Sequence, residues 1–238
     1  MGSLSGCPIL LTSGPTFAPL DAVRSLTNHS TGRLGSTIAA ELARRGAEVW
    51  MLAGETSVTP IQMYPNETFP ALHVQPFRTV PELREMIRNA LSTDHIDAVV
   101  MAAAVLDYLP IAASEGKKSS DEEEWVITLR RGEKLIEQLR KWSDRVVIVG
   151  FKLESHVTLE TLSQQAWELM QRSDAALVVA NRLEEIEASR HVAYLYERID
   201  NSMGYNRSSP LNTREEIAAA LADRLETRRR DAANRRNG

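Results

Sequence analysis

A run of small polar residues and glycines opens the first helical pattern of the chain. The run is Asn28 to Thr31 and includes Ser30, and it is followed by Gly32 and Gly35. Glycine lets the backbone approach a ligand closely, and the free N–H groups at a helix N-terminus attract anions. This combination is typical of a loop that binds a phosphate-bearing ligand. It is not a complete fingerprint, because the two glycines supply only the last half of G-x-G-x-x-G and no Walker motif is present.

Ligands of open parallel sheets bind beyond the carboxyl ends of the strands, so the residues at those ends are further candidates. Gly14 lies at the end of the predicted strand at 7–14, and Ala103, Ala104, Asp107 and Lys117 lie at or after the end of the one at 96–105. Gly150, Phe151 and Lys152 lie at the end of the predicted strand at 145–151, and Asn181 and Arg182 at the end of the one at 175–181. The set is rich in glycines, amides and lysines and contains no cluster of histidine and cysteine. It therefore favours an anionic ligand over a transition metal. The sequence pattern gives Cys7 no neighbouring residue that would act as its general base, so it disfavours covalent catalysis by this thiol.

Apolar segments of strand length alternate with amphipathic segments of helix length along most of the chain. Strands are predicted at 7–14, 47–54, 71–77, 96–105, 145–151, 175–181 and, last, 191–197; helices are predicted at 34–45, 79–91, 132–142, 158–173 and 213–225. Thr79 with Glu82, and Thr213 with Glu216, have the spacing of a capping box. Strands separated by single helices predict βαβ units. We therefore expect a doubly wound, mostly parallel, Rossmann-like α/β fold.

Two segments interrupt this alternation. Residues 110–131 contain a lysine pair, an acidic run and the strand-like "WVITL", which together predict a hairpin or an arm that packs on a partner subunit. Residues 227–238 are polar and rich in arginine, so we expect a disordered charged tail. The remaining residues, 1–226, are predicted to form a single α/β domain that carries the excursion.

Composition limits the classes of partner. The 238 residues carry a formal net charge of −4, which gives no reason to expect nucleic acid or an anionic membrane surface as partner. The single cysteine, Cys7, excludes an internal disulfide and fits a reducing compartment. The first residues lack the pattern of a signal peptide, and no apolar run is long enough to cross a membrane. We therefore expect a cytoplasmic protein.

Four motifs occur in an order that resembles a known family. They are "SLTNHSTGRLG", "AAAVLDYLP" followed by lysines, "IVGFKLE" and "LVVAN". Together they resemble phosphopantothenate–cysteine ligase in its stand-alone bacterial form, and the resemblance extends over residues 9–196. The joint occurrence of the first two motifs is its most specific element.

The resemblance implies an acid–amino-acid ligase of coenzyme A biosynthesis. The substrates would be 4′-phosphopantothenate and L-cysteine, and CTP would be the nucleotide, with ATP as the alternative. The carboxylate would attack the α-phosphate to give an acyl-cytidylate and pyrophosphate, and the cysteine amine would then displace CMP. The resemblance further implies Mg²⁺ bound through the triphosphate rather than by protein ligands, a homodimer, and an option of a separate decarboxylase partner.

The resemblance also assigns roles to residues of this chain. It makes Asn28 and Lys117 catalytic. It assigns nucleotide binding to Gly14, Ser30, Gly32, Gly35, Asp107, Lys117, Phe151 and Arg172, and substrate binding to Arg24, Asn28, Ala103, Ala104 and Asp107. On pattern alone, Asn28 is a turn or helix-cap residue, Lys117 is a solvated loop lysine and Arg24 is a surface arginine.

Two positions depart from the family pattern. Glu168 stands where one of two basic residues is usual, one turn before Arg172, and Arg182 stands where aspartate is usual. Arg182 could replace the lost cation, or the nucleotide preference could differ. A non-catalytic or regulatory paralogue that binds nucleotide or phosphopantothenate is therefore the alternative interpretation. A nicotinamide-dependent reductase, with Glu55 as its ribose ligand, is disfavoured because the first glycine and a catalytic tyrosine are missing.

Overall fold

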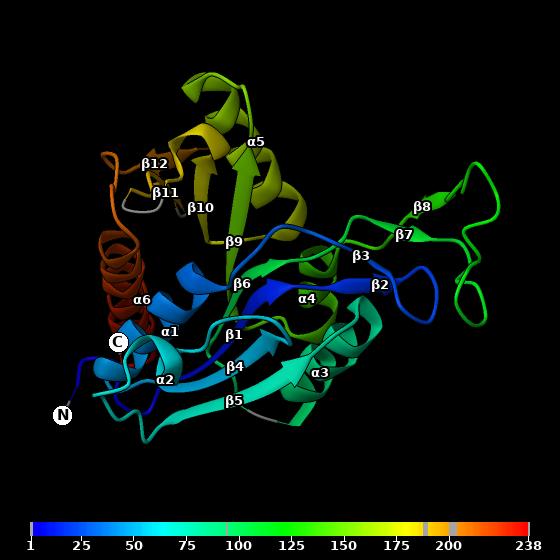
Figure 1. Ribbon diagram of the computed structural model, residues 1–238. Helices are drawn as coiled ribbons and strands as arrows, with labels where there is room; N and C mark the ends of the chain where they lie inside the picture. The colour runs from blue at the N-terminus through cyan, green and yellow to red at the C-terminus, as the bar shows by residue number, and fades with distance from the viewer. Residues whose placement is uncertain (1, 94, 188–189, 200–203, 238) are drawn as a thin grey trace.

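An eight-stranded sheet forms the centre of the fold (Figure 1). A computed structural model describes residues 2–93, 95–187, 190–199 and 204–237. In spatial order the strands are β12 (Tyr205–Arg207), β11 (Tyr194–Arg198), β10 (Leu177–Arg182), β9 (Val147–Glu154), β6 (Ala98–Ala104), β1 (Pro8–Pro15), β4 (Glu48–Gly54) and β5 (Leu72–Phe77). From β10 to β5 they are parallel, and β11 and β12 are antiparallel to their neighbours. The predicted doubly wound, mostly parallel fold is confirmed.

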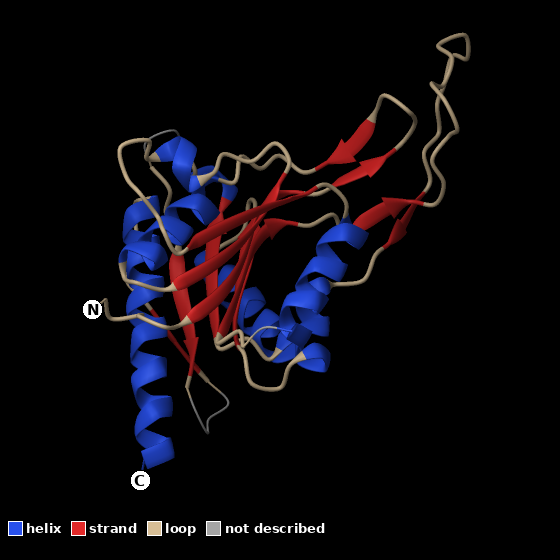
Figure 2. Ribbon diagram, turned by 90° about the horizontal axis from the view of Figure 1, so that it is seen from below, coloured by secondary structure: helices blue, strands red, loops and turns tan. Residues whose placement is uncertain are grey.

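Helices cover both faces of the sheet (Figure 2). One face packs on α1 (Arg33–Arg44) and α6 (Arg214–Asn237), and the other packs on α3 (Val80–Thr93), α4 (Leu135–Trp142) and α5 (Leu159–Ser173). Successive side chains of a strand point to opposite faces. In β1, Leu10 accordingly belongs to the α3–α5 core, whereas Ile9 and Leu11 belong to the α1–α6 core, and all three are fully buried. A continuous apolar strand is therefore required at this position.

Side-chain caps fix the starts of the two helices for which the sequence predicts a capping box. At α3, Thr79 N donates to Glu82 Oε2 at 3.0 Å and Glu82 N donates to Thr79 Oγ1 at 3.3 Å, as a capping box requires. At α6, Glu216 N donates to Thr213 Oγ1 at 3.1 Å, but the Glu216 carboxylate accepts from Asn212 N instead of Thr213 N. Both predicted helix starts are confirmed within one or two residues. The short helices α2 (Pro60–Met63) and η1 (Leu183–Glu185) lie in loops after β4 and β10.

Two hairpins project from the same side of the sheet (Figures 1 and 2). β2 (Phe17–Pro19) and β3 (Ser25–Thr27) form the first hairpin, which the sequence analysis did not predict. β7 (Tyr108–Pro110) and β8 (Leu129–Arg131) form the base of the second, which we call the arm. Of the strand-like segment at 125–129, only the last residue is in a strand. The expected excursion at 110–131 is thus a hairpin arm.

The end of the chain differs from the sequence prediction. The segment at 191–197 is not the last strand, because the polar residues of β12 pair with β11. The expected disordered tail at 227–238 is helical as far as Asn237, as the end of α6. Arg224 and Arg228 both pair with Glu197 of β11, at 3.3 and 3.2 Å, and so hold α6 on the sheet beyond its apolar part. No helix in the described ranges combines the length and apolar character needed to span a membrane.

Candidate active site

The carboxyl ends of β1, β4 and β6 form a rim where most of the predicted binding residues converge. β1 lies between β4 and β6, because the chain runs from β1 to β4 and β5 on one side and returns to β6 on the other. A doubly wound sheet binds its ligand at such a switch point. Two fully buried hydroxyls connect the strand ends: Thr12 Oγ1 accepts from Ala103 N at 3.2 Å, and Thr16 Oγ1 accepts from Leu106 N at 3.0 Å.

Asn28 bridges the two loops of the switch point. Its Nδ2 donates to the carbonyl oxygens of Ala104 and Val105, each at 3.2 Å. The side chain is half-buried, and its Oδ1 accepts no hydrogen bond from the described part of the chain. Asn28 is therefore not a helix cap: Gly32 occupies the N-cap position of α1. The structure brings Asn28, Ala103 and Ala104 together, as their shared assignment to the substrate requires.

Glycines allow the start of α1 to pack directly on the end of β1. Gly14 and Gly32 have φ values of +83° and +72°, which L-residues with a side chain rarely adopt. A Cβ on Gly35 would lie 2.6 Å from Ser13 Cβ, and Ser13 Oγ donates to Gly32 O at 3.0 Å. The glycines therefore bring the backbones of β1 and α1 close together at this point. We call Gly14, Gly32, Gly35 and Gly54 the glycine cradle.

The amino end of α1 lacks a compensating negative charge. Its first turn contains no acidic residue, and Gly32 provides no side-chain cap. Ser30 Oγ and Thr31 Oγ1 accept only long bonds, at 3.4 and 3.5 Å, from the amides of Gly32 and Arg33. A helix terminus with a positive partial charge and weakly engaged hydroxyls suits an anionic ligand such as phosphate.

Asp107 and Lys117 do not pair with each other. The Asp107 carboxylate binds Lys134 Nζ at 2.6 Å, whereas Lys117 is exposed on the arm without an ion-pair partner among the described residues. The sequence analysis missed Lys134, since a lysine in the first turn of a predicted helix carries no distinguishing signal. The rim therefore contains a cation from the start of α4. The segment that carries Lys117 lies instead beside the β2–β3 turn, where Ala22 N donates to Gly116 O at 3.1 Å.

Arg24 links the β2–β3 hairpin to the arm. Its guanidinium binds the Asp21 carboxylate at 2.6 Å and lies over the Trp125 ring, 5.2 Å from the ring centroid. The Asp21 side chain is buried, and it also accepts from the backbone amides of Val23, Arg24 and Lys118. Desolvation alone would raise the pKa of Asp21, but these amides and the guanidinium together lower it. Arg24 is thus part of a structured junction rather than an isolated surface arginine.

The remaining predicted residues lie apart from the cradle or are engaged elsewhere. Phe151 is half-buried in β9 and packs against the α1–α6 core. Arg172 lies in the last turn of α5, where its guanidinium approaches Glu137 at 3.4 Å and Glu168 at 3.8 Å. This turn precedes β10, so the structure does not bring Arg172 to the carboxyl rim. Arg182 forms a bidentate pair with Glu185, at 3.0 and 2.6 Å, and is not a free cation.

A buried histidine adjoins the end of β10. Asn181 Nδ2 and His191 Nε2 are 3.3 Å apart. The His191 ring is buried, and its Nδ1 has no hydrogen-bond partner among the described residues. Desolvation, followed by the positive charge of Arg214, lowers the pKa of His191 from 6.5 to about 4. The imidazole is therefore neutral at physiological pH.

This burial predicts a pH dependence of stability. In the unfolded chain His191 becomes protonated below about pH 6.5, whereas in the folded chain it stays neutral down to about pH 4. Between these pH values the unfolded state binds one more proton, so acidification favours unfolding. We expect His191 to remove about 3 kcal/mol of the free energy of unfolding across this window, at about 1.4 kcal/mol per pH unit. Urea denaturation of wild type and His191→Gln at several pH values checks this, because the variant should lack this component. Parallel pH profiles would contradict it.

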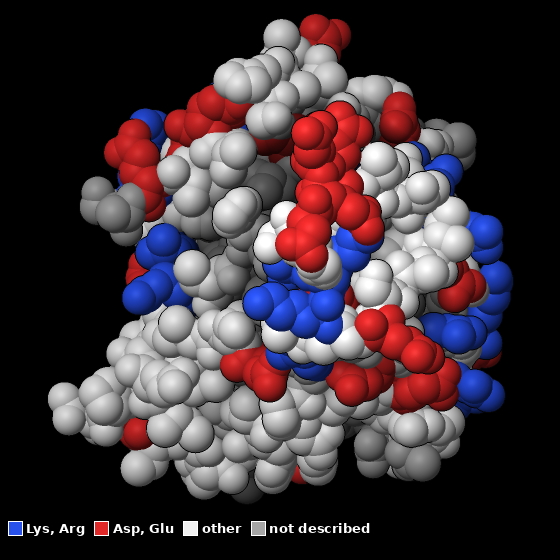
Figure 3. All heavy atoms as spheres, turned by 45° about the vertical axis from the view of Figure 1, so that its right-hand side comes forward, with Lys and Arg blue, Asp and Glu red and all other residues white. Residues whose placement is uncertain are grey.

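The arm carries separated charges and exposed apolar side chains. Acidic residues at 121–124 and basic Lys117, Arg130 and Arg131 are all exposed. Figure 3, which looks onto this side of the molecule, shows acidic and basic side chains gathered in distinct patches. Val126 is 80% exposed, and Ile111 and Tyr108 are more than half exposed.

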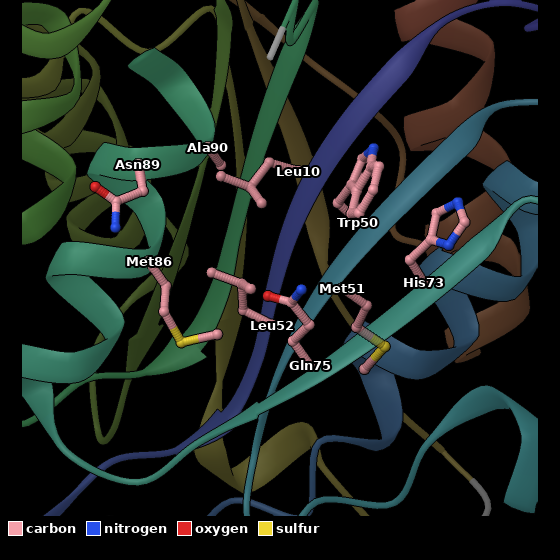
Figure 4. A pocket seen from close by; sticks show the side chains of 9 residues that line it. All are labelled: Leu10, Trp50, Met51, Leu52, His73, Gln75, Met86, Asn89 and Ala90. Atoms are coloured by element: carbon pink, nitrogen blue, oxygen red, sulfur yellow. The ribbon is translucent and has the colours of Figure 1, made fainter. Parts of the chain in front are cut away.

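A separate pocket of about 220 Å³ lies between α3 and the β1–β4–β5 edge of the sheet (Figure 4). It is lined by Leu10, Trp50, Met51, Leu52, His73, Gln75, Met86, Asn89 and Ala90. Trp50 and His73 stack with their ring centroids 4.3 Å apart. Trp50 and His73 belong to the first halves of β4 and β5, so this pocket is distinct from the carboxyl rim. It contains none of the residues predicted to bind nucleotide or substrate.

The fold and the rim together define the class of protein: a Rossmann-like α/β domain with a glycine-lined loop at its switch point. Residues 4–228 match the family model described as the DNA/pantothenate metabolism flavoprotein C-terminal domain, and the chain belongs to that family. The resemblance inferred from the four motifs is thus confirmed at the level of the family. No group of three or more His, Cys, Asp or Glu side chains in the described ranges is arranged to hold a metal ion.

Individual relatives agree with this assignment. The coenzyme A biosynthesis bifunctional protein CoaBC of Thermococcus kodakarensis is 32% identical, over 94% of this chain and 52% of the relative. A cysteine/cysteine sulfinic acid decarboxylase from an unknown prokaryotic organism is 29% identical, over 94% of this chain and 59% of the relative. The chain thus spans little more than half the length of these relatives. A crystal structure of the DNA/pantothenate metabolism flavoprotein from Streptococcus pneumoniae is 28% identical with a TM-score of 0.80, covering 93% of this chain and 99% of the other.

Proposed function

We propose that this chain is a phosphopantothenate–cysteine ligase that acts in coenzyme A biosynthesis. Membership of the family and similarity to a coenzyme A biosynthesis protein support the proposal. The observation that carries it is the bridge from Asn28 to the carbonyl oxygens of Ala104 and Val105. This bridge joins the two most specific motifs of the chain at the switch point, beside a helix terminus suited to phosphate.

The proposed reaction needs positioning and charge neutralisation rather than a protein nucleophile. A carboxylate oxygen of 4′-phosphopantothenate attacks the α-phosphorus of CTP, and the bond to pyrophosphate breaks. The L-cysteine amine then attacks the acyl carbon, loses a proton, and the bond to CMP breaks. The amino end of α1 and Lys117 would neutralise phosphate charge, and Asn28 would orient the acyl group. Mg²⁺ would bind through the triphosphate, since the Asp107 carboxylate is engaged by Lys134.

Nucleotide-dependent release of pyrophosphate tests the proposal. The purified chain is incubated with Mg²⁺, 4′-phosphopantothenate and either CTP or ATP, first without and then with L-cysteine. We expect pyrophosphate with CTP, and the amide product only when cysteine is added. If no nucleoside triphosphate gave pyrophosphate release, but the chain still bound nucleotide or phosphopantothenate, the result would favour the non-catalytic paralogue. The pairing of Arg182 with Glu185 favours that alternative, because it leaves the lost cation at Glu168 without a free replacement.

Lys117 should contribute to nucleotide binding more than to phosphopantothenate binding. We expect Lys117→Ala to raise the KM for CTP about tenfold, the loss of one charge-assisted hydrogen bond, and to change the KM for phosphopantothenate less than twofold. Lys118→Ala is the matched control, because Lys118 Nζ is already engaged by Glu122 at 2.5 Å. Equal effects of Lys117→Ala on both substrates would contradict the assignment.

We further propose that the arm mediates homodimerisation. The exposed Val126, Ile111 and Tyr108, and the separation of acidic from basic side chains, would suit pairing with a second copy. In such a dimer the arm of one subunit could complete the substrate site of the other. A decarboxylase acting as a separate partner is part of the same proposal. Mixing the chain with a candidate decarboxylase and measuring the mass of the complex checks this association.

A further inference from the structure

Ser57, in the turn after β4, packs against three of the four glycines of the cradle, Gly14, Gly32 and Gly54. A Cβ on either Gly14 or Gly32 would lie 2.8 Å from Ser57 Cβ, and a Cβ on Gly54 would lie 3.1 Å from Ser57 Oγ. Larger residues at these positions would therefore collide with this serine. Neither the motifs nor the family resemblance assigned Ser57 a role.

The Ser57 hydroxyl is buried and has no hydrogen-bond partner in the described part of the chain. Most buried polar atoms in proteins are satisfied, and an unsatisfied hydroxyl costs free energy of folding. Neighbouring hydroxyls show that the local backbone offers acceptors: Ser13 Oγ donates to Gly32 O, and Ser36 Oγ donates to Val58 O. The unpaired state of Ser57 Oγ is thus particular to this serine.

The backbone around Ser57 is fixed to the amino end of α1. Ser57 N donates to Gly54 O at 2.7 Å, and Val58 N donates to Thr31 O at 3.0 Å. The Ser57 hydroxyl is therefore held next to the helix terminus that lacks any acidic residue in its first turn. A buried, unpaired donor and a positive helix end at one point provide two independent features that favour an anion.

We propose that Ser57 is a phosphate-binding residue, whose hydroxyl donates to a phosphate oxygen seated at the amino end of α1. This inference rests on the proposed nucleotide-dependent function and adds a residue to its site. Because the hydroxyl is covered in this conformation, it must turn away from Gly14 and Gly32 as the phosphate enters.

Binding measurements with Ser57→Ala separate a donor from a packing residue. Alanine keeps the Cβ that fills the cradle and removes only the hydroxyl. Titration calorimetry uses CTP, ATP and inorganic triphosphate, each with Mg²⁺, on the full chain. We expect Ser57→Ala to raise the dissociation constants of the preferred nucleotide and of triphosphate at least tenfold, while its Tm is unchanged or higher because an unsatisfied hydroxyl is gone.

Ser36→Ala is the matched control. It removes a neighbouring hydroxyl that is engaged by Val58 O, so its Tm should fall while its dissociation constants stay within twofold of wild type. Wild-type affinity in Ser57→Ala, tighter binding, or a lowered Tm with equal loss for all ligands would overturn the assignment of Ser57. Failure of wild type to bind either nucleotide would instead refute the proposed function; Ser57-dependent binding of triphosphate would then still support the anion site, and its absence would reject both.

Discussion

Asn28→Ala should abolish most amide formation while pyrophosphate release continues. The substitution removes the Nδ2 that bridges to the carbonyl oxygens of Ala104 and Val105, and it removes an amide from the proposed acyl site. Loss of one preorganised polar group at a reacting centre typically lowers turnover about a hundredfold. We therefore expect product formation to fall by this factor and the acyl-nucleotide to accumulate. Quench-flow sampling with separation of nucleotides measures both quantities.

The exposed neighbour His29 provides a control for Asn28. His29→Ala alters the same loop without removing a hydrogen bond across the switch point, and its turnover should stay within twofold of wild type. Asn28→Asp tests the donor itself, because it keeps the shape and replaces the Nδ2 group by an acceptor that the two carbonyl oxygens repel. If Asn28→Ala lost nucleotide binding altogether, the role assigned to Asn28 would be wrong.

Gly35→Ala should destabilise the fold and disable the anion site together. The new Cβ would lie 2.6 Å from Ser13 Cβ and 3.4 Å from Ser13 Cα, so α1 must move away from β1. Overpacking of this kind costs about 1–3 kcal/mol, and the shift also displaces the N–H groups at the start of α1. Urea denaturation measures the first effect, and titration with nucleotide measures the second.

A double-mutant cycle identifies the collision as the cause. Ser13→Gly removes the side chain that the new Cβ would meet, so the pair Ser13→Gly and Gly35→Ala should be more stable than the sum of the single changes predicts. Gly132→Ala is the matched control, because its Cβ would have its nearest neighbour at 3.5 Å, an ordinary contact. A free energy of unfolding for Gly35→Ala equal to that of Gly132→Ala would disprove the steric argument.

The sequence predicted the layered fold because its signals are local and repeated. Alternating apolar and amphipathic segments indicate β1, α1, β4 and the elements that follow them. The starts of α3 and α6 are indicated by a threonine and a glutamate only three positions apart. It missed β2, β3 and β12, which are three-residue strands of mixed polarity. Such strands depend on pairing partners, and local propensity hardly contributes.

The candidate site was predictable only where its residues belong to motifs. Asn28 and the glycines of α1 were identified from their order in the loop, and the structure brings them to one rim. Lys134 and Ser57 were missed, since a lone lysine or serine becomes meaningful only through neighbours that are distant in sequence. The position of Arg172 likewise depends on the direction of α5, which spacing along the helix does not reveal.

The central position of β1 has a consequence for how the chain folds. The bond from Ala103 N to Thr12 Oγ1 joins residues 91 positions apart, and Asn28 reaches Ala104 across 76. Contacts between such distant residues slow folding, because a long loop must close before they form. A chain emerging from the ribosome can pair β1 with β4 early, but the switch point cannot exist until β6 has been synthesised. Assembly of the rim is therefore a late event, and shortening the chain before residue 104 would remove the site without removing its first motif.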